Sequence, residues 1–173
     1  MKNINSTKRL VTVAAVAAIY AVLTVALAPI SYGNLQFRVS ELLVLLAFFD
    51  PFYIAGLTLG CLVANLLGPN GIMDVILGTL ATFISVSAIS LTAKFTKGSK
   101  LGLWLSSLWP TLFNGLIIGW MLHYLFELPL ALTMLEVGIG EFVVVTIVGG
   151  PLFILIMKKY PHLLHAHRQN MQS

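Results

Sequence analysis

Charged residues are scarce in this chain. Lys, Arg, Asp and Glu together make up 9% of its 173 residues, whereas 58% of the residues are hydrophobic. A soluble domain carries roughly 25% charged residues, so this chain lacks the polar side chains that would cover a water-soluble globule. The composition predicts an all-α integral membrane protein, with residues 1–173 forming a single membrane domain.

Cysteine and the familiar catalytic motifs are also missing or nearly so. The single cysteine, Cys61, lies in an apolar run, so no disulfide framework or cysteine metal site is available. No Gly-rich phosphate loop of the form G-x-x-x-x-G-K-[ST] occurs, and neither H-E-x-x-H nor G-x-S-x-G is present. We therefore expect no enzyme, no cofactor and no ATP-hydrolysing motor within this chain. Three histidines near the C-terminus are interpreted as a solvated tail rather than a metal site: His162, His165 and His167.

What the chain does contain is a series of six apolar runs. A membrane-spanning helix needs about 20 residues, with a range of about 17–25. Four of the runs meet this length, the third is marginal, and the second is short, at roughly 22 Å as an α-helix. The six predicted helices cover about 10–29, 35–49, 51–67, 73–93, 102–126 and 133–157.

The positions of the basic residues decide between six crossings and five. With six crossings and the N-terminus inside, nine of the ten Lys and Arg residues fall on the inner side, and Arg38 alone falls outside. Five crossings would move the basic residues after the second run to the outer side. The positive-inside rule therefore favours six crossings in the cell membrane, with both termini cytoplasmic. The net charge of +4 then reflects membrane topology rather than a nucleic-acid partner.

Acidic and amide side chains gather in the outer half of the predicted bundle. Intramembrane carboxylates usually face a cavity or a charged partner, and Glu141 is the strongest example because it lies within the apolar stretch Val137–Val145. Its alternative role is a salt bridge with Arg38. The outer-half set comprises Gln36, Glu41, Asn65, Asp74, Asn114, Glu127, Glu136 and Glu141. We interpret this set as the surroundings of a substrate site.

Several members of this set also have structural interpretations. Arg38 and Glu41 are three residues apart and could pair on one helical face. Asp74 is predicted mainly to cap its helix. Asn65 and Asn114 could form hydrogen bonds between helices.

The first apolar run carries alanines at helical spacing. Ala14/Ala18 and Ala17/Ala21 are small-xxx-small pairs, which let another helix approach closely. The pairs predict either packing within the chain or docking of a separate membrane subunit, and spacing alone does not separate the two.

The passage from Tyr32 to Glu41 resembles the signature of a known family. It reads Tyr-Gly, two residues, then Gln-Phe-Arg-Val-Ser-Glu, and it follows a first helix that ends near Pro29. This pattern resembles that of the QueT family. Asp50-Pro51 and the turn between Asn65 and Asp74 also fit, and the resemblance covers nearly the whole chain.

The resemblance implies a fold, a function and partners. QueT-like proteins are substrate-binding S components of energy-coupling factor (ECF) transporters, which are six-helix membrane proteins thought to import a queuosine precursor. The resemblance implies partnership with a transmembrane coupling protein, EcfT, and with two ABC-type ATPases. It assigns Ala14, Ala18 and Ala21 to the docking face for the coupling protein.

The implied ligand is a 7-deazaguanine base that bears an aminomethyl group. Its N–H edge suits a carboxylate, its oxygen suits an amide or Arg, and a protonated aminomethyl arm suits a second carboxylate. Phe37 or Trp120, or else Tyr32 or Phe142, could stack on the base. The expected polar contacts are Gln36, Arg38, Glu41, Asn114 and Glu141, and whether Arg38 touches the ligand or only orients the glutamates stays open.

Three rival functions remain at this point. The same pocket chemistry would suit an S component for another vitamin or heterocycle. An intramembrane enzyme using Glu41 or Glu141 as acid or base is a second alternative, although no nucleophile or metal motif supports it. A non-catalytic assembly subunit would explain the alanines but not the outer polar set.

Overall fold

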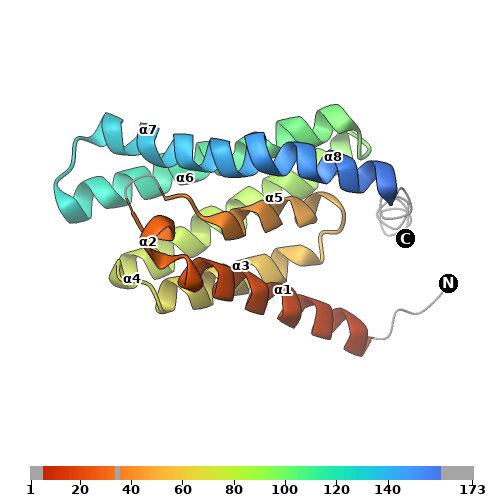
Figure 1. The fold of residues 1–173 in the computed structure, drawn as a ribbon, viewed down its shortest axis with the longest axis horizontal. Helices are drawn as coiled ribbons and strands as arrows, with labels where there is room; N and C mark the ends of the chain where they lie inside the picture. The colour runs from red at the N-terminus through yellow and green to blue at the C-terminus, as the bar shows by residue number, and fades with distance from the viewer. Residues whose placement is uncertain (1–5, 34–35, 161–173) are drawn as a thin grey trace.

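The chain folds into helices joined by short connections (Figure 1). The computed structural model describes residues 6–33 and 36–160. All regular secondary structure in these ranges is helical, which agrees with the predicted all-α class. In chain order the elements are α1 (Ser6–Ala26), α2 (Ala28–Ser31), the 3₁₀-helix η1 (Val39–Phe48), α3 (Tyr53–Leu66), α4 (Gly71–Met73), the π-helix η2 (Asp74–Gly78), α5 (Thr79–Phe95), α6 (Lys100–Phe126), α7 (Leu130–Glu141), the π-helix η3 (Phe142–Gly149) and α8 (Gly150–Lys159).

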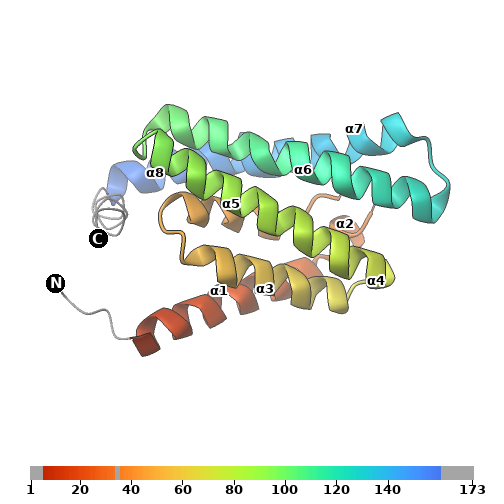
Figure 2. The ribbon, with the colours of Figure 1, turned by 180° about the vertical axis from the view of Figure 1, so that it is seen from behind.

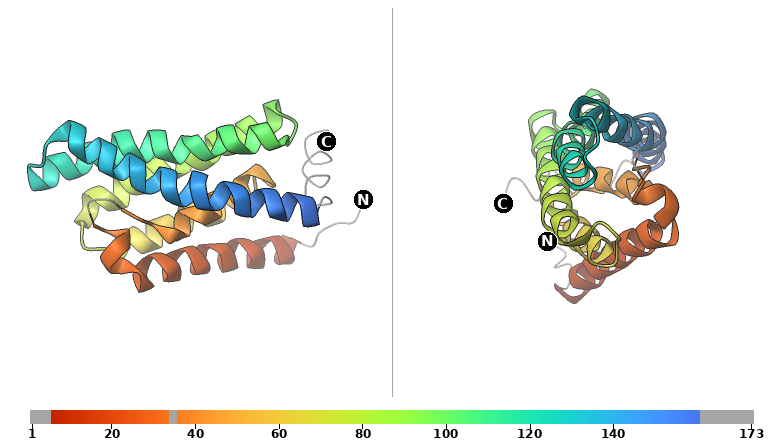
Figure 3. Two further views of the ribbon diagram at one scale, coloured as in Figure 1. Left: turned by 45° about the horizontal axis from the view of Figure 1, so that its top comes forward. Right: turned by 90° about the vertical axis from the view of Figure 1, so that its left-hand side faces the viewer.

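The predicted apolar runs all correspond to helical segments of one elongated bundle. Two long helical segments are each built from three elements that follow one another without a break. The first consists of α4, η2 and α5, and the second of α7, η3 and α8. The beginning of α1 and the end of α8 lie at the same end of the bundle, as Figures 1 and 2 both show. In the end-on view of Figure 3, α1 lies on the opposite side of the bundle from α6 and α7.

Four of these segments are long and apolar enough to cross a membrane. They are Thr7–Ala26, Gly71–Phe95, Lys100–Phe126 and Leu130–Lys159. The other two apolar helices are shorter, with 10 residues in η1 and 14 in α3. The structure therefore supports an all-α membrane protein, but helix length alone does not establish the predicted count of six crossings.

The second predicted helix differs most from the expectation. Residues 36–38 were predicted to be helical, but they are not, and the helix begins only at Val39 as a 3₁₀-helix. A 3₁₀-helix rises about 2.0 Å per residue, so its ten residues cover about 20 Å. The tighter winding lets a short segment reach nearly as far as the α-helix predicted over 35–49.

Basic residues are separated along the bundle as predicted. The end at which α1 begins and α8 stops also carries the turn between α5 and α6 (Figure 1). Arg38 lies on the connection that precedes η1, at the opposite end. The described basic residues at the first end are Lys8, Arg9, Lys94, Lys97, Lys100, Lys158 and Lys159. The predicted histidine tail, from His162 to His167, lies outside the described residues.

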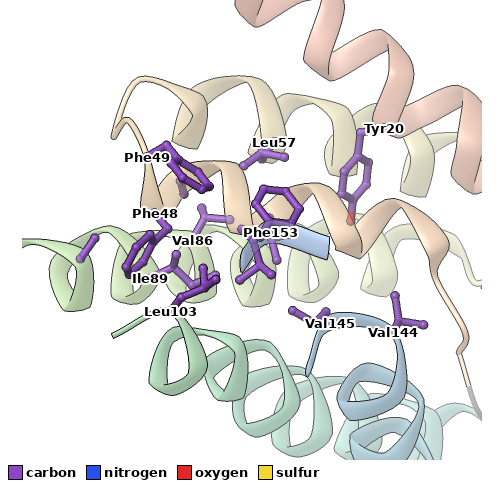
Figure 4. Close-up of a cluster of buried hydrophobic side chains, with 14 of the residues drawn as sticks. Tyr20, Phe48, Phe49, Leu57, Val86, Ile89, Leu103, Val144, Val145 and Phe153 are labelled. Carbon is purple, nitrogen blue, oxygen red and sulfur yellow. The ribbon is translucent and has the colours of Figure 1, made fainter. Parts of the chain in front are cut away.

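η1 lies at the centre of the fold. It packs against α1, α3, α5, α6 and η3, so it is enclosed on nearly every side. Its residues Val44, Leu45 and Phe48 are fully buried, which explains why the run has no polar face. Figure 4 shows this core, with Tyr20 directed from α1 toward η1.

α1 and α3 approach each other closely through two glycines that were not singled out in the sequence. A Cβ on Gly60 would lie 2.8 Å from both the Ala17 carbonyl oxygen and the Tyr20 Cβ. A Cβ on Gly56 would lie 2.9 Å from the Val13 carbonyl oxygen. Gly56 and Gly60 thus form a small-xxx-small pair that lets the two backbones nearly touch.

The alanines of α1 consequently divide between two faces. Ala14 and Ala18 are exposed, whereas Ala17 lies against Gly60 and Ala21 belongs to the core at 7% exposure. Packing within the chain therefore accounts for Ala17 and Ala21, whereas Ala14 and Ala18 are accessible to a separate subunit. Ala21, however, has little surface to offer a partner, so its assignment to the docking face does not fit its position.

We expect Gly60→Ala to lower the free energy of unfolding by about 1–3 kcal/mol, because the added methyl group overpacks a contact made by backbone atoms. Denaturant unfolding in detergent would measure this loss. Gly138→Ala is the matched control, since its Cβ would meet no atom nearer than the Thr111 carbonyl oxygen at 3.8 Å. An equal loss in both variants would contradict close packing of α1 on α3.

Candidate substrate site

Glu41 is held at the centre of the bundle by neighbouring helices. It lies in the first turn of η1 and is 1% exposed. Its Oε1 accepts hydrogen bonds from the hydroxyl of Tyr20 on α1 and from Thr82 Oγ1 on α5, the latter at 3.4 Å. Its Oε2 is also buried but has no hydrogen-bond partner among the described residues. One carboxylate oxygen is thus used to fix the side chain, and the other remains available.

Ten more side chains in the described ranges carry a buried polar atom without a partner, and three of them are residues that the sequence assigned to ligand contact. Gln36 Nε2, Asn114 Nδ2 and Glu141 Oε2 are buried without a partner in the described part of the chain. These residues are 2%, 4% and 2% exposed, respectively. A buried polar group left unpaired costs about 1–3 kcal/mol, and most such groups in proteins are satisfied. Four of the eleven unpaired groups in the described residues, two of them carboxylate oxygens, therefore belong to the predicted ligand contacts, which supports a site for a polar ligand there.

The fold brings the elements that carry these groups together around η1. η1 contacts both α6, which carries Asn114, and η3, which directly follows Glu141. Glu141 lies within electrostatic range of Glu41 and Arg38. Next to Asn114, Gly115 faces Gly138, where an added Cβ would lie 3.4 Å from the Gly138 Cα, one helical turn before Glu141. The structure thus brings the two glutamates near each other, and the helix that carries Asn114 packs against both η1 and α7.

Gln36 reaches this region through an unusual backbone. Its φ is +43°, a left-handed conformation that is uncommon for residues other than glycine. Its N–H donates to the Gly33 carbonyl oxygen at 3.1 Å, and its own carbonyl accepts from the Arg38 N–H at 2.7 Å. Gln36 lies two residues before Arg38, which anchors the connection through its ion pair with Asp74.

Arg38 pairs with a partner that the sequence analysis did not assign to it. Its Nη2 lies 3.1 Å from Asp74 Oδ2, and its Nε donates to the Ser31 carbonyl oxygen at 3.3 Å. The predicted helical pair with Glu41 and the alternative salt bridge with Glu141 are both wrong. Arg38 precedes η1 in non-helical backbone, so the spacing rule for helical neighbours does not apply to it.

Asp74 is not a helix cap but one half of this buried ion pair. It is fully buried at the start of η2, and Asn70 Nδ2 also donates to its Oδ2 at 3.3 Å. Asn65 Nδ2 donates to the Asp74 main-chain oxygen at 3.0 Å, which confirms the prediction that Asn65 links helices. The acid that opens η2 is therefore braced from both α3 and the preceding turn.

The aromatic residues divide between the core and the outer surface. Phe37 is partly buried and packs against the core. Trp120 is 44% exposed and stacks on Tyr124, with ring centroids 5.8 Å apart. Trp120 lies on a different face of α6 from the buried Asn114 and Ile118, so its stacking on a ligand stays a prediction that this position does not favour.

Three residues of the site were missed in the sequence. Tyr20 and Thr82 hold Glu41, and Cys61 contacts the Thr82 hydroxyl at 3.2 Å and Asn65 Nδ2 at 3.3 Å. Tyr20 had a usable signal, since it is a hydroxyl-bearing residue in the middle of the apolar part of α1, between Thr12 and Thr24. Among residues 6–33 and 36–160, no group of three or more His, Cys, Asp or Glu side chains is placed to hold a metal ion.

These features together define a class of protein. A helical membrane bundle that buries fixed hydrogen-bond donors and acceptors is suited to bind a polar solute within the membrane. That is the arrangement expected of a membrane transporter.

Comparison with known proteins identifies the family. The model of the family described as QueT transporter matches residues 10–158, and the chain belongs to this family. The resemblance noted in the sequence is thereby confirmed, and the family to which the chain belongs is described as one of transporters.

A curated relative shares part of this sequence. The queuosine precursor transporter QueT of Lactococcus lactis subsp. cremoris (strain MG1363) is 46% identical over 85 residues. The match covers 48% of this chain and spans about half the length of the relative, 50%. No solved structure matches the chain.

We expect Tyr20→Phe to lower the free energy of unfolding by about 1–3 kcal/mol, because a buried carboxylate oxygen loses its hydroxyl donor. Thermal and denaturant unfolding in detergent would measure the effect. Tyr124→Phe is the matched control, since Tyr124 is 64% exposed on α6. Equal stability of the Tyr20 variant and this control would show that the Tyr20 hydroxyl does not support Glu41.

Proposed function

We propose that this chain is the substrate-binding S component of an ATP-driven ECF importer that takes up a queuosine precursor. The observation that carries the proposal is that four of the eleven buried, unpartnered polar groups in the described residues belong to Gln36, Glu41, Asn114 and Glu141, and two of these four are carboxylate oxygens. The family and the name of the Lactococcus relative support transport as the activity and a queuosine precursor as the class of solute. An S component for a different heterocycle is the alternative to be tested.

The ligand proposed for this set is a base like 7-aminomethyl-7-deazaguanine. One carboxylate accepts from the N–H donors of the guanine edge, and the other receives the protonated aminomethyl arm. The amide N–H groups of Gln36 and Asn114 donate to the oxygen and ring nitrogen acceptors. Phe37, next to Gln36, is the aromatic residue best placed to stack on the base.

The proposed topology has six crossings, with both termini in the cytoplasm. The concentration of described basic residues at one end of the bundle supports this orientation. η1 and α3 are shorter than the hydrocarbon core of about 30 Å, so their connections enter the membrane depth. Non-helical backbone is tolerated there where protein buries it, and Gln36 and Arg38 are 2% and 3% exposed.

The proposed partners are a transmembrane coupling protein, EcfT, and two ABC-type ATPases. The chain has no phosphate-binding loop of its own, so the energy for import has to come from separate subunits. Ala14 and Ala18 provide an exposed small-residue face on α1 on which a partner helix can pack closely.

We expect Glu41→Gln and Glu141→Gln each to weaken binding of 7-aminomethyl-7-deazaguanine about 10- to 100-fold, because each removes a charged acceptor from the site. Isothermal titration of the purified protein in detergent would measure the affinity. Glu127→Gln, at an exposed position between α6 and α7, is the matched control. Unchanged affinity in both site variants would remove this assignment, and tighter binding of another heterocycle by the wild type would favour the alternative.

We expect Ala18→Trp to abolish co-purification with the coupling protein while leaving substrate affinity intact, because the large ring prevents close approach at an exposed face. Ala131→Trp, at an exposed alanine of α7, is the matched control and should assemble normally. Loss of both assembly and substrate binding in the Ala18 variant would indicate an internal packing role instead.

A further inference from the structure

The buried charges of the site do not balance one another. Four charged side chains in the described part of the chain are almost completely buried: Arg38, Glu41, Asp74 and Glu141, at 3%, 1%, 0% and 2% exposure. One is a cation and three are carboxylates. Burying an unpaired charge is costly. The carboxylate that pairs with Arg38 therefore determines which of the other buried carboxylates are left without a cation.

Arg38 is committed to Asp74 by contacts on both sides of the pair. Its Nη2 lies 3.1 and 3.5 Å from the two Asp74 oxygens, and its Nε donates to the Ser31 carbonyl oxygen. The guanidinium also lies 5.3 Å from the centroid of the Tyr32 ring, within cation–π range. Asp74 in turn accepts from Asn70. The guanidinium is therefore held at the α3–η2 corner by several groups at once.

Glu41 and Glu141 are left without a cation bonded to them. Arg38 is near enough to both for electrostatic interaction, yet no salt bridge joins it to either one within the described ranges. The hydrogen bonds to Glu41 come from the neutral hydroxyls of Tyr20 and Thr82. Each glutamate also has one buried oxygen without a partner. The two carboxylates can therefore be neutralised by a cationic ligand.

We propose that Asp74 sets the charge selectivity of the site as a positioning residue. By pairing with Arg38, it prevents the guanidinium from neutralising Glu41 and Glu141, so the site prefers a ligand with a cationic arm over a neutral ligand with the same ring. This inference rests on the proposed binding of a 7-deazaguanine. It assigns Arg38 to the support of the site rather than to contact with the ligand.

The same pair also supports the backbone of Gln36. The left-handed conformation of Gln36 is strained, and such strain persists only where the surroundings enforce it. Arg38, two residues later, is the nearest side chain that anchors this connection. Breaking the Arg38–Asp74 pair is therefore expected to lower the affinity for every ligand. The preference for a cationic ligand is expected to fall only where the Arg38 guanidinium remains and is no longer paired with Asp74.

The test compares two probes that share a ring system. 7-Aminomethyl-7-deazaguanine carries a cationic arm, and 7-cyano-7-deazaguanine carries a neutral one. The ratio of their dissociation constants, measured by isothermal titration of the full chain in detergent, reports the preference for charge. We expect Asp74→Asn to reduce the wild-type preference about tenfold or more, because Arg38 is then free to pair with the glutamates.

Two further variants separate positioning from a general loss of structure. Asp74→Glu keeps the carboxylate and is expected to preserve the preference for the cationic probe. Arg38→Gln combined with Asp74→Asn removes both charges, and we expect it to restore the preference even though both affinities fall. Asp50→Asn is the matched control, since Asp50 lies in the turn after η1, where it accepts from the Phe52 N–H at 2.9 Å.

The outcomes distinguish this inference from the proposed function. A wild type that binds neither probe would contradict deazaguanine binding itself. A wild type that binds both equally, or an Asp74→Asn variant that keeps the full preference, would overturn the role of Asp74 while leaving deazaguanine binding in place. If Asp74→Asn does not fold, the variant that combines Arg38→Gln with Asp74→Asn provides the test. Loss of the preference for the cationic probe in this double variant would overturn the proposed role of Asp74.

Discussion

The hydrogen bond from Tyr20 to Glu41 joins the first helix to the centre of the fold, and the site is arranged around it. A carboxylate buried this deeply needs donors, and they come from helices that are distant in the sequence. Once Oε1 is fixed by Tyr20 and Thr82, the position of Oε2 is set as well. The same contact also determines how η1 sits between α1 and α5. The packing of the core and the geometry of the site therefore depend on one buried side chain.

Much of the fold could be predicted from hydrophobic runs and charge placement. The apolar runs, the turn at Asp50 and the division of the basic residues all follow from the cost of exposing polar groups to lipid. The non-helical residues 36–38 could not be placed in this way. Arg38 is anchored by Asp74, a contact between residues 36 positions apart that no local pattern reveals.

The candidate site could be predicted by residue type but not by pairing. An acidic residue in an apolar run is a visible signal, so Glu41 and Glu141 were found. Which carboxylate Arg38 would choose depends on the position of η2, and spacing in the sequence does not contain that information. The exposed position of Trp120 could not be predicted for a related reason, since the face of a helix that points inward is decided by the neighbouring helices.

The close contact between α1 and α3 restricts the movement of one helix relative to the other. Because Gly56 and Gly60 leave almost no space between the two backbones, the two helices have little freedom to slide past one another. Tyr20 lies on this tightly held helix, only two residues from the exposed Ala18. A displacement of α1 caused by contact at Ala18 would therefore also move the Tyr20 hydroxyl that holds Glu41.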